Sequence, residues 1–251
     1  VGIVVTILDY KTGIYLPLVD VDVPLSFAWY GLLFIMIAGA ANGVNLTDGL
    51  DGLASGTAAF SLLTYTSMAV VAFIVGQRMG TERAADLDLA ILGASLIGAT
   101  IGFLWYNSYP AEIFMGDVGS QFLGFGFAAI AVIAAEYDTS RTSLLIMPLL
   151  FFHFIFDTTF TYFRRLFVGQ NVTQAHRAHL YQLMHQLGAS HLRVSVFHFI
   201  VTVAQGIGAL VLIEMDTQYR IVVFAPYVVF QVVYAVVVFR MSSERGLLND
   251  R

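Results

Sequence analysis

The sequence has no cysteine and few charged residues, and each scarcity narrows the classes of protein to which it can belong. With 0 Cys among 251 residues, disulfides, thiolate metal sites and cysteine nucleophiles are excluded. Charged residues make up only 12% of the chain, hydrophobic residues make up 58%, and the mean hydropathy is +0.79. About a quarter of the residues of a typical soluble domain are charged. The low charge content therefore indicates that much of this chain lies in a membrane and not in water. The net charge of -5 offers no basic field, and we expect no nucleic-acid partner.

Long apolar runs occupy most of the sequence. Because a backbone in lipid must satisfy its own hydrogen bonds, these runs predict an all-α, polytopic transmembrane helix bundle in a single membrane domain, residues 1–251. The expected spans number about seven, at 27–44, 55–76, 87–106, 120–135, 144–163, 196–213 and 221–239. Residues 1–8 are apolar but too short to cross about 30 Å of hydrocarbon. We therefore interpret them as a partial N-terminal helix and expect the chain to begin inside a longer protein.

The loops between the expected spans divide the polar residues between two membrane faces. Residues 9–26, with Asp, Gly and Pro among Val and Leu, predict a hairpin-like segment on the outer face. Alternation of the spans places three loops, around 45–52, 107–119 and 164–193, together on the other face. With the tail from Arg240 onward, which falls on the same side, this face carries seven of the twelve Lys and Arg residues. By the positive-inside tendency, it is expected to be cytoplasmic.

The first polar motif, residues 42–53, reads NGVNLTDGLDGL at the mouth of a span. Asn45, Asp48 and Asp51 recur every three residues, so a helical turn would bring their oxygens roughly onto one face. Oxygen ligands of this kind suit Mg²⁺ and the phosphates that it bridges. The alternative is a helix cap followed by a glycine turn. Carboxylates beside hydrocarbon are costly and usually functional, which favours the cation site.

The second motif, residues 105–120, reads WYNSYPAEIFMGDVGS and precedes another apolar run. At the start of a helix, backbone N–H groups can meet an anion while Asp117 holds a cation. Two simpler interpretations remain open for single residues in this motif. Ser120 can serve only as a helix cap, and Phe114 only as an interfacial anchor.

The third motif, residues 174–188, contains His176 and His179 with Arg177 between them. On a helix the two histidines would share a face. A phosphate cradle, a transition-metal site and a solvated amphipathic helix are the competing interpretations. No Asp or Glu is interleaved as a third metal ligand, and arginines at 164–165 lie nearby, so phosphate contact is favoured.

One carboxylate, Asp157, lies inside an apolar run, with His153 one turn earlier. A carboxylate within a membrane bundle is a functional candidate by default. Pairing with His153 or with an arginine would instead make it structural. The sequence leaves both interpretations open.

These three motifs together resemble the polyprenyl-phosphate N-acetylhexosamine-1-phosphate transferase superfamily, also called glycosyltransferase family 4, from about Phe27 to Gly188. The resemblance implies an enzyme that transfers a sugar-1-phosphate from a UDP-sugar to undecaprenyl phosphate and releases UMP. It implies Mg²⁺ as the cofactor, with Mn²⁺ as an alternative. The expected location is the cytoplasmic face of the bacterial inner membrane, in cell-wall or surface-glycan synthesis. A homodimer is a further expectation.

The resemblance also implies roles for individual residues. The expected catalytic residues are Asp117 and Asp48, which would bind the metal, and Asp51, which would contact nucleotide or metal. Asn45 and Asn107 would orient them. The remaining substrate-binding residues are Phe114, which would stack on uracil, and His176, Arg177 and His179, which would meet phosphate.

Two departures from the family pattern concern the rest of the chain. Family members carry an Asp-Asp pair on an earlier cytoplasmic loop, and nothing upstream of Asn42 supplies it, because Asp20 and Asp22 are separated and fall on the other face. The motifs also mix two branches: residues 45–53 resemble the lipid I synthase branch, whereas 176–182 resemble the GlcNAc-1-phosphate branch. A catalytically incomplete membrane scaffold and an ion or solute transporter are the alternative functions.

Overall fold

Six helices are long and apolar enough to cross a membrane in the computed structural model, which describes residues 12–16, 21–81, 84–137, 146–171 and 177–248. They are α2 (Ala28–Thr47), α3 (Leu53–Met79), α4 (Ala84–Asn107), α5 (Gly116–Tyr137), α9 (His191–Glu214) and α10 (Thr217–Glu244). The predicted all-α, polytopic bundle is confirmed. The expected partial helix at residues 1–8 lies outside the described residues.

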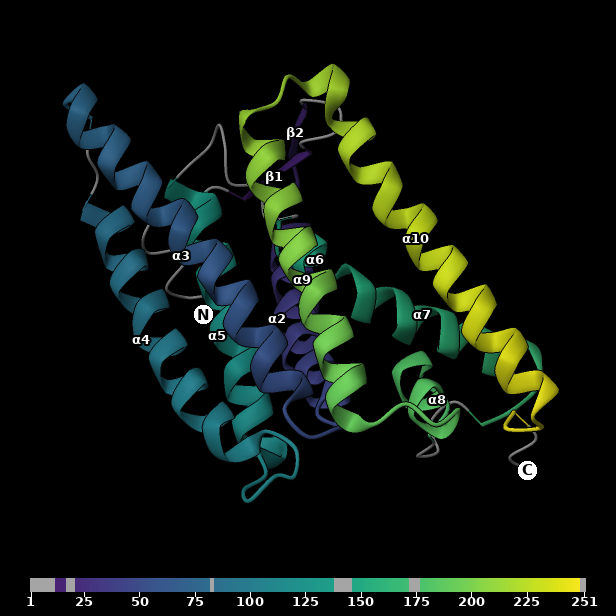
Figure 1. The fold of residues 1–251 in the computed structure, drawn as a ribbon. Helices are drawn as coiled ribbons and strands as arrows, with labels where there is room; N and C mark the ends of the chain where they lie inside the picture. The colour runs from purple at the N-terminus through teal and green to yellow at the C-terminus, as the bar shows by residue number, and fades with distance from the viewer. Residues whose placement is uncertain (1–11, 17–20, 82–83, 138–145, 172–176, 249–251) are drawn as a thin grey trace.

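Among the described residues, six single helices are long enough to span a membrane, one fewer than the seven or so expected. The run expected at 144–163 is divided in its described part into the short helix α6 (Ile146–Leu150) and α7 (Phe152–Phe167), neither of which is long enough to cross a membrane alone. Phe151 leaves helical geometry between them, with φ -103° and ψ 14°. The physical reason lies in α7, which buries polar side chains such as His153 and Asp157 against other helices, so it is tilted out of the direction of the long spans (Figure 1).

Close packing of α2 against α5 positions the two helix ends that carry the first and second motifs. Gly124 of α5 lies directly against the backbone of Ala40 and Ala41 in α2, where a side chain would collide with main-chain atoms. Small residues allow such close approach between membrane helices. The C-terminal end of α2 and the N-terminal end of α5 therefore meet at one end of the bundle, here called the site end.

Helix α3 lies in the interior of the bundle, between α4 and α9. Its first half is almost fully buried, with Leu53, Ala58 and Leu62 all 0% exposed. The helix begins after Gly52, whose φ of 73° is a left-handed conformation that favours glycine. The buried start of α3 gives the loop before it, residues 48–52, a rigid base.

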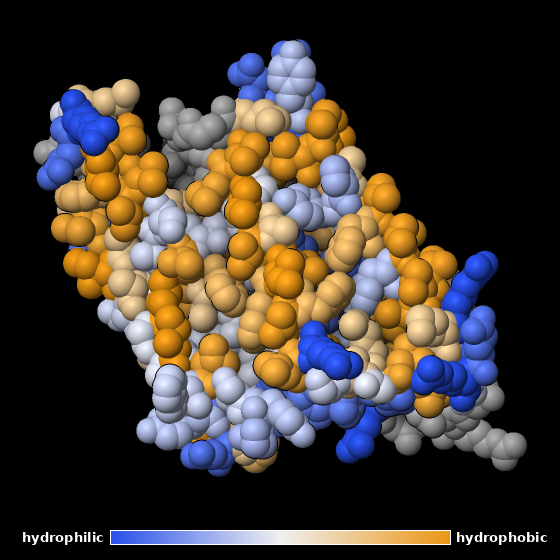
Figure 2. All heavy atoms as spheres, in the orientation of Figure 1, coloured by the Kyte–Doolittle hydropathy of each residue, from blue (hydrophilic) through white to orange (hydrophobic). Residues whose placement is uncertain are grey.

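Two strands, β1 (Gly13–Leu16) and β2 (Val21–Pro24), pair antiparallel at the end of the bundle opposite the site end (Figure 1). Arg220 of α10 donates a hydrogen bond to the Tyr15 hydroxyl at 3.0 Å and so ties β1 to the helices. Hydrophilic residues gather at the upper and lower ends of the face drawn in Figure 2, and hydrophobic residues cover the middle. This pattern, with the six spans, makes the chain a multi-pass membrane protein.

Candidate active site

The first and second motifs meet through Asn45. Its side-chain amide donates hydrogen bonds to Oδ1 of Asp117 at 2.8 Å and to Oγ of Ser120 at 2.9 Å. Ser120 also donates to the carbonyl of Gly116 at 2.9 Å, so it is bound within the first turn of α5 and to α2 at once. Asn45 thus fixes the orientation of the Asp117 carboxylate, which is otherwise exposed.

Asp48 is the C-cap residue of α2 and faces the start of α5. The pKa of Asp48 is raised from an ordinary 3.8 to about 6, chiefly by partial burial. A hydrogen bond from the Gly116 backbone lowers this pKa, and the negative charges of Asp117 and Asp51 raise it. Three carboxylates therefore lie within electrostatic range of one another at the site end. Such mutual repulsion is relieved by a bound cation.

Asp51 holds the second loop in addition to lying within electrostatic range of Asp48. Its Oδ2 accepts a hydrogen bond from the backbone N–H of Ala111 at 3.2 Å. The expected helical turn through Asn45, Asp48 and Asp51 is wrong, because α2 ends at Thr47 and Asp51 lies in the turn that follows. Asp51 still faces the same end of the bundle.

Asn107 lies beneath the site and is only 2% exposed. Its Oδ1 accepts hydrogen bonds from the Gly52 backbone at 3.2 Å and the Ser55 hydroxyl at 2.8 Å, and its amide donates to the Ile113 carbonyl at 2.9 Å. One side chain therefore joins the loop before α3 to the loop before α5. Its contact with substrate remains a prediction.

The third motif does not form the helix that its spacing suggested. Helix α8 (Leu180–Gln186) begins after His179, which is its N-cap in extended conformation, and Arg177 precedes it outside the helix. His179 therefore caps the helix instead of lying on one of its faces, and His176 lies outside the described residues. The helix starts here because His179 and Gln182 form a capping box and because Asp157 accepts the free N–H groups of the first turn.

Asp157 is a structural anchor of α8. The carboxylate, 3% exposed, accepts hydrogen bonds from the backbone N–H of Leu180 at 2.8 Å and of Tyr181 at 3.3 Å, while Nδ1 of His179 lies 3.4 Å from it. One expected partner, His153, is bound elsewhere, because its Nδ1 lies 2.7 Å from Oε1 of Gln205. Asp157 thus holds the third motif against the bundle.

The remaining predicted residues differ in exposure. Phe114 is 75% exposed on the loop between α4 and α5, and the side chain of Arg177 is exposed before α8. His179 is buried and turned toward Asp157, with its ring stacked on Tyr181 at a centroid distance of 5.8 Å. Their contacts with uracil and phosphate remain predictions.

Three contacts at the site end carry no signal in the sequence. The Tyr181 hydroxyl donates to the Leu46 carbonyl at 2.8 Å, which brings α8 to the first motif. The Ser195 hydroxyl donates to the Asp51 carbonyl at 3.1 Å. Nδ1 of His191 lies 3.7 Å from Oδ2 of Asp51. These pairs are up to 144 residues apart in the sequence, so only the fold reveals them.

The donor set at Asp48 and Asp117 fits a hard divalent cation. Within the described ranges, no group of three or more His, Cys, Asp or Glu side chains is placed to hold a metal ion. Magnesium commonly binds one or two carboxylates and completes its shell with water and substrate phosphates. Asp48 and Asp117 would supply these two carboxylates. The pKa of Asp48 is raised mainly by partial burial and further by the nearby charges of Asp117 and Asp51, and a bound cation would offset those charges.

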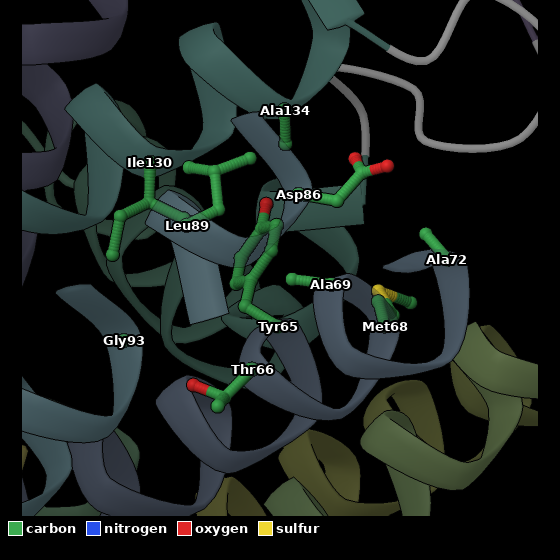
Figure 3. Close-up of a pocket in the computed structure, with 10 residues that line it drawn as sticks. All are labelled: Tyr65, Thr66, Met68, Ala69, Ala72, Asp86, Leu89, Gly93, Ile130 and Ala134. Atoms are coloured by element: carbon green, nitrogen blue, oxygen red, sulfur yellow. The ribbon is translucent and has the colours of Figure 1, made fainter. Parts of the chain in front are cut away.

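Two cavities bear on what the site can bind. An apolar groove of about 470 Å³ runs along α2 and α7, from Ile35 past Asn42 to Leu46, next to the first motif. A cavity of about 20 Å³ lies between α3, α4 and α5, and Tyr65 and Asp86 are among the residues that line it (Figure 3). The second cavity has room for about one water molecule. Of these two cavities, the groove beside α2 is the one with room for a substrate chain.

Comparison with known proteins supports the same family as the three motifs do. The family model described as glycosyl transferase family 4 matches residues 1–135, more than half of the chain. A phospho-N-acetylmuramoyl-pentapeptide-transferase of Pelobacter propionicus is 44% identical over 54% of this chain and 40% of its own length. A relative from Rubrobacter xylanophilus with the same name is 50% identical over 41% of this chain and 27% of its own length.

A third relative covers more of the chain. The probable undecaprenyl-phosphate N-acetylglucosaminyl 1-phosphate transferase of Bacillus subtilis is 30% identical over 90% of this chain and 58% of its own length. The chain thus spans only part of each of these relatives, from 27% to 58% of their length. The predicted family is confirmed by the family model and by these matches. The chain belongs to glycosyl transferase family 4.

Proposed function

We propose that the protein containing this chain transfers a sugar-1-phosphate from a UDP-sugar to undecaprenyl phosphate and releases UMP, with Mg²⁺ as the cofactor. The observation that carries the proposal is the meeting of Asp48 and Asp117, oriented by Asn45, at the end of a membrane bundle. The names of the relatives, which denote phospho-sugar and polyprenyl-phosphate transferases, support the reaction class. The site end would face the cytoplasm of the bacterial inner membrane.

The reaction joins two anions, and the residues present suit that task. An acceptor phosphate oxygen attacks the β-phosphorus of the donor, a new P–O bond forms, and the pyrophosphate bond breaks to release UMP. Magnesium, when bound, offsets the repulsion between the phosphates. Asp48 and Asp117 would hold the ion, Asn45 keeps Asp117 in place, and Arg177 would contact a donor phosphate.

The groove beside α2 supports a lipid acceptor. It is bounded by Asn42 and Leu46 on α2, the helix that Asp48 caps. An isoprenoid chain in this groove would have its phosphate at the end that carries the carboxylates. A soluble nucleotide-sugar would arrive from the aqueous side, where Phe114 is exposed and available to stack on uracil.

The sugar is the finer part of the proposal. N-acetylglucosamine is favoured over the MurNAc-pentapeptide because the Bacillus subtilis relative matches 90% of the chain, whereas the Pelobacter relative matches 54%. Product analysis with each UDP-sugar distinguishes the two donors.

The test is UMP release from UDP-sugar and undecaprenyl phosphate by the full-length protein. We expect Mg²⁺-dependent release that falls by at least about 100-fold in Asp117→Asn, in line with the loss of an electrostatic group at a reacting centre. Near wild-type release by Asp117→Asn would contradict the proposal. Two alternatives would then gain support: a catalytically incomplete scaffold and a transporter. The position of Asp48 and Asp117 at helix ends already disfavours the transporter, because transport sites lie near the bilayer midplane.

A further inference from the structure

A second apolar groove lies on the other side of α7, between α7 and α10. Its volume is about 880 Å³, and we call it the α7–α10 groove. Phe156 and Phe163 of α7 and Val236 of α10 contribute to its apolar wall. Helices α7 and α10 approach each other near the site end and separate away from it (Figure 1). Phe163 and Phe167, which line the groove, are 48% and 84% exposed, so the groove opens on the apolar surface of the molecule.

Two arginines stand in the wall of this apolar groove. Arg164 of α7 and Arg240 of α10 both line it, and the guanidinium carbon of Arg164 lies 5.9 Å from the ring centre of Phe239. No carboxylate of the described residues lies within 4.0 Å of either guanidinium. Within the described part of the chain, Asp157 acts on Arg164 only at longer range, so neither guanidinium is in salt-bridge contact with a carboxylate and both can contact an anionic group from outside the protein.

We propose that the α7–α10 groove binds a membrane phospholipid with an anionic headgroup. Its acyl chains would pack against the phenylalanines of α7 and Val236, and its phosphate would contact Arg164 and Arg240. Arginine is suited to this role because it is weakly hydrated and its planar fork matches phosphate oxygens. Basic residues at the ends of membrane helices attract anionic lipid headgroups for the same reason.

The position of the groove favours a phospholipid over the lipid acceptor. Ile155 and Thr159 line both grooves, so α7 separates the α7–α10 groove from the groove beside α2. A lipid in the α7–α10 groove has its headgroup at arginines, whereas a lipid beside α2 has its headgroup near Asp48. Only the second position suits a reacting phosphate, and this distinction rests on the proposed function.

The test is lipid retention by the purified full-length protein, measured by native mass spectrometry with phosphatidylglycerol and phosphatidylcholine of the same acyl chains. Wild-type protein should retain phosphatidylglycerol preferentially. The double variant Arg164→Gln, Arg240→Gln should bind it about tenfold more weakly. Arg193→Gln removes an exposed arginine at the same end of the molecule and should have no effect.

A second variant tests the proposal independently, in case the double arginine variant does not fold. Val236→Trp fills the groove without changing its charge and should also lower phosphatidylglycerol retention. Asp117→Asn should retain the lipid as wild type does, so that failure of this proposal is distinguishable from failure of the proposed function. Equal retention of the two lipids by wild type, or unchanged retention in both groove variants, would overturn the proposal. Displacement of phosphatidylglycerol by equimolar undecaprenyl phosphate would also overturn it.

Discussion

Asn45 and Asp117 are joined by a hydrogen bond of 2.8 Å although 72 residues separate them in the sequence. The bond exists because α2 and α5 pack closely enough for their ends to meet. Gly124 permits this packing, since a Cβ at that position would lie 2.6 Å from the Ala41 Cα. The geometry of the site therefore depends on a residue about two turns away from Asp117 along α5.

The first prediction concerns this close approach. Gly124→Ala should force α2 and α5 apart, lower the free energy of unfolding by about 1–3 kcal/mol and reduce UMP release. Gly126→Ala is the matched control, because its nearest contact would be Leu96 Cδ1 at an ordinary 3.6 Å. Thermal unfolding and activity of the two full-length variants check the prediction. Equal behaviour of the two variants would show that the approach of α2 and α5 is not critical.

The second prediction concerns pH. Because the pKa of Asp48 rises from 3.8 to about 6 on folding, the folded protein binds a proton there more tightly than the unfolded chain does. In the absence of divalent metal, stability should therefore fall as pH rises through this range. Asp48→Asn removes the ionised carboxylate and should raise the melting temperature of metal-free protein at neutral pH.

The same variant, Asp48→Asn, also shows whether Mg²⁺ and pH act through the ionised carboxylate of Asp48. Mg²⁺ should raise the melting temperature of the wild type at neutral pH, because the ion binds only the folded protein. It should have little effect on Asp48→Asn. Below pH 3.8 the wild type and the variant should converge, since Asp48 is then protonated in both the folded and the unfolded state. A lower melting temperature for metal-free Asp48→Asn at neutral pH would contradict this assignment.

The third prediction concerns the anchor of α8. Asp157→Ala leaves the backbone N–H groups of Leu180 and Tyr181 without their acceptor, at a cost of about 1–3 kcal/mol for each buried group. Amide hydrogen exchange at residues 180–183 should become faster, while exchange in α3 should be unchanged. Asp157→Asn retains one acceptor and should show an intermediate effect. Unchanged exchange in Asp157→Ala would mean that other contacts hold α8.

Much of the architecture could be predicted from the sequence because the bilayer imposes long apolar helices. The same constraint placed Asp48 and Asp117 at the ends of spans, and alternation of the spans put both motifs on one face. The run at 144–163 was the exception. Its polar residues, such as Asp157, bind groups in other helices, and a hydropathy pattern contains no information about those partners.

Local spacing was a poorer guide than the order of the spans. Three-residue intervals suggested one helical face for Asp48 and Asp51, but α2 ends before both of them. The same argument failed at His179, where a buried carboxylate from α7 fixes the start of α8. In both places a long-range hydrogen bond decides the conformation, so the local pattern could not predict it.

The central claim is that Asp48 and Asp117 together hold one divalent cation. Mn²⁺ titration of the full-length protein, followed by electron paramagnetic resonance, tests it most directly. We predict one site that Mg²⁺ competes for, with affinity reduced at least about tenfold by Asp48→Asn and by Asp117→Asn. Asp22→Asn, on β2 at the opposite end, should bind as wild type does. Wild-type Mn²⁺ affinity in both site variants would contradict the claim.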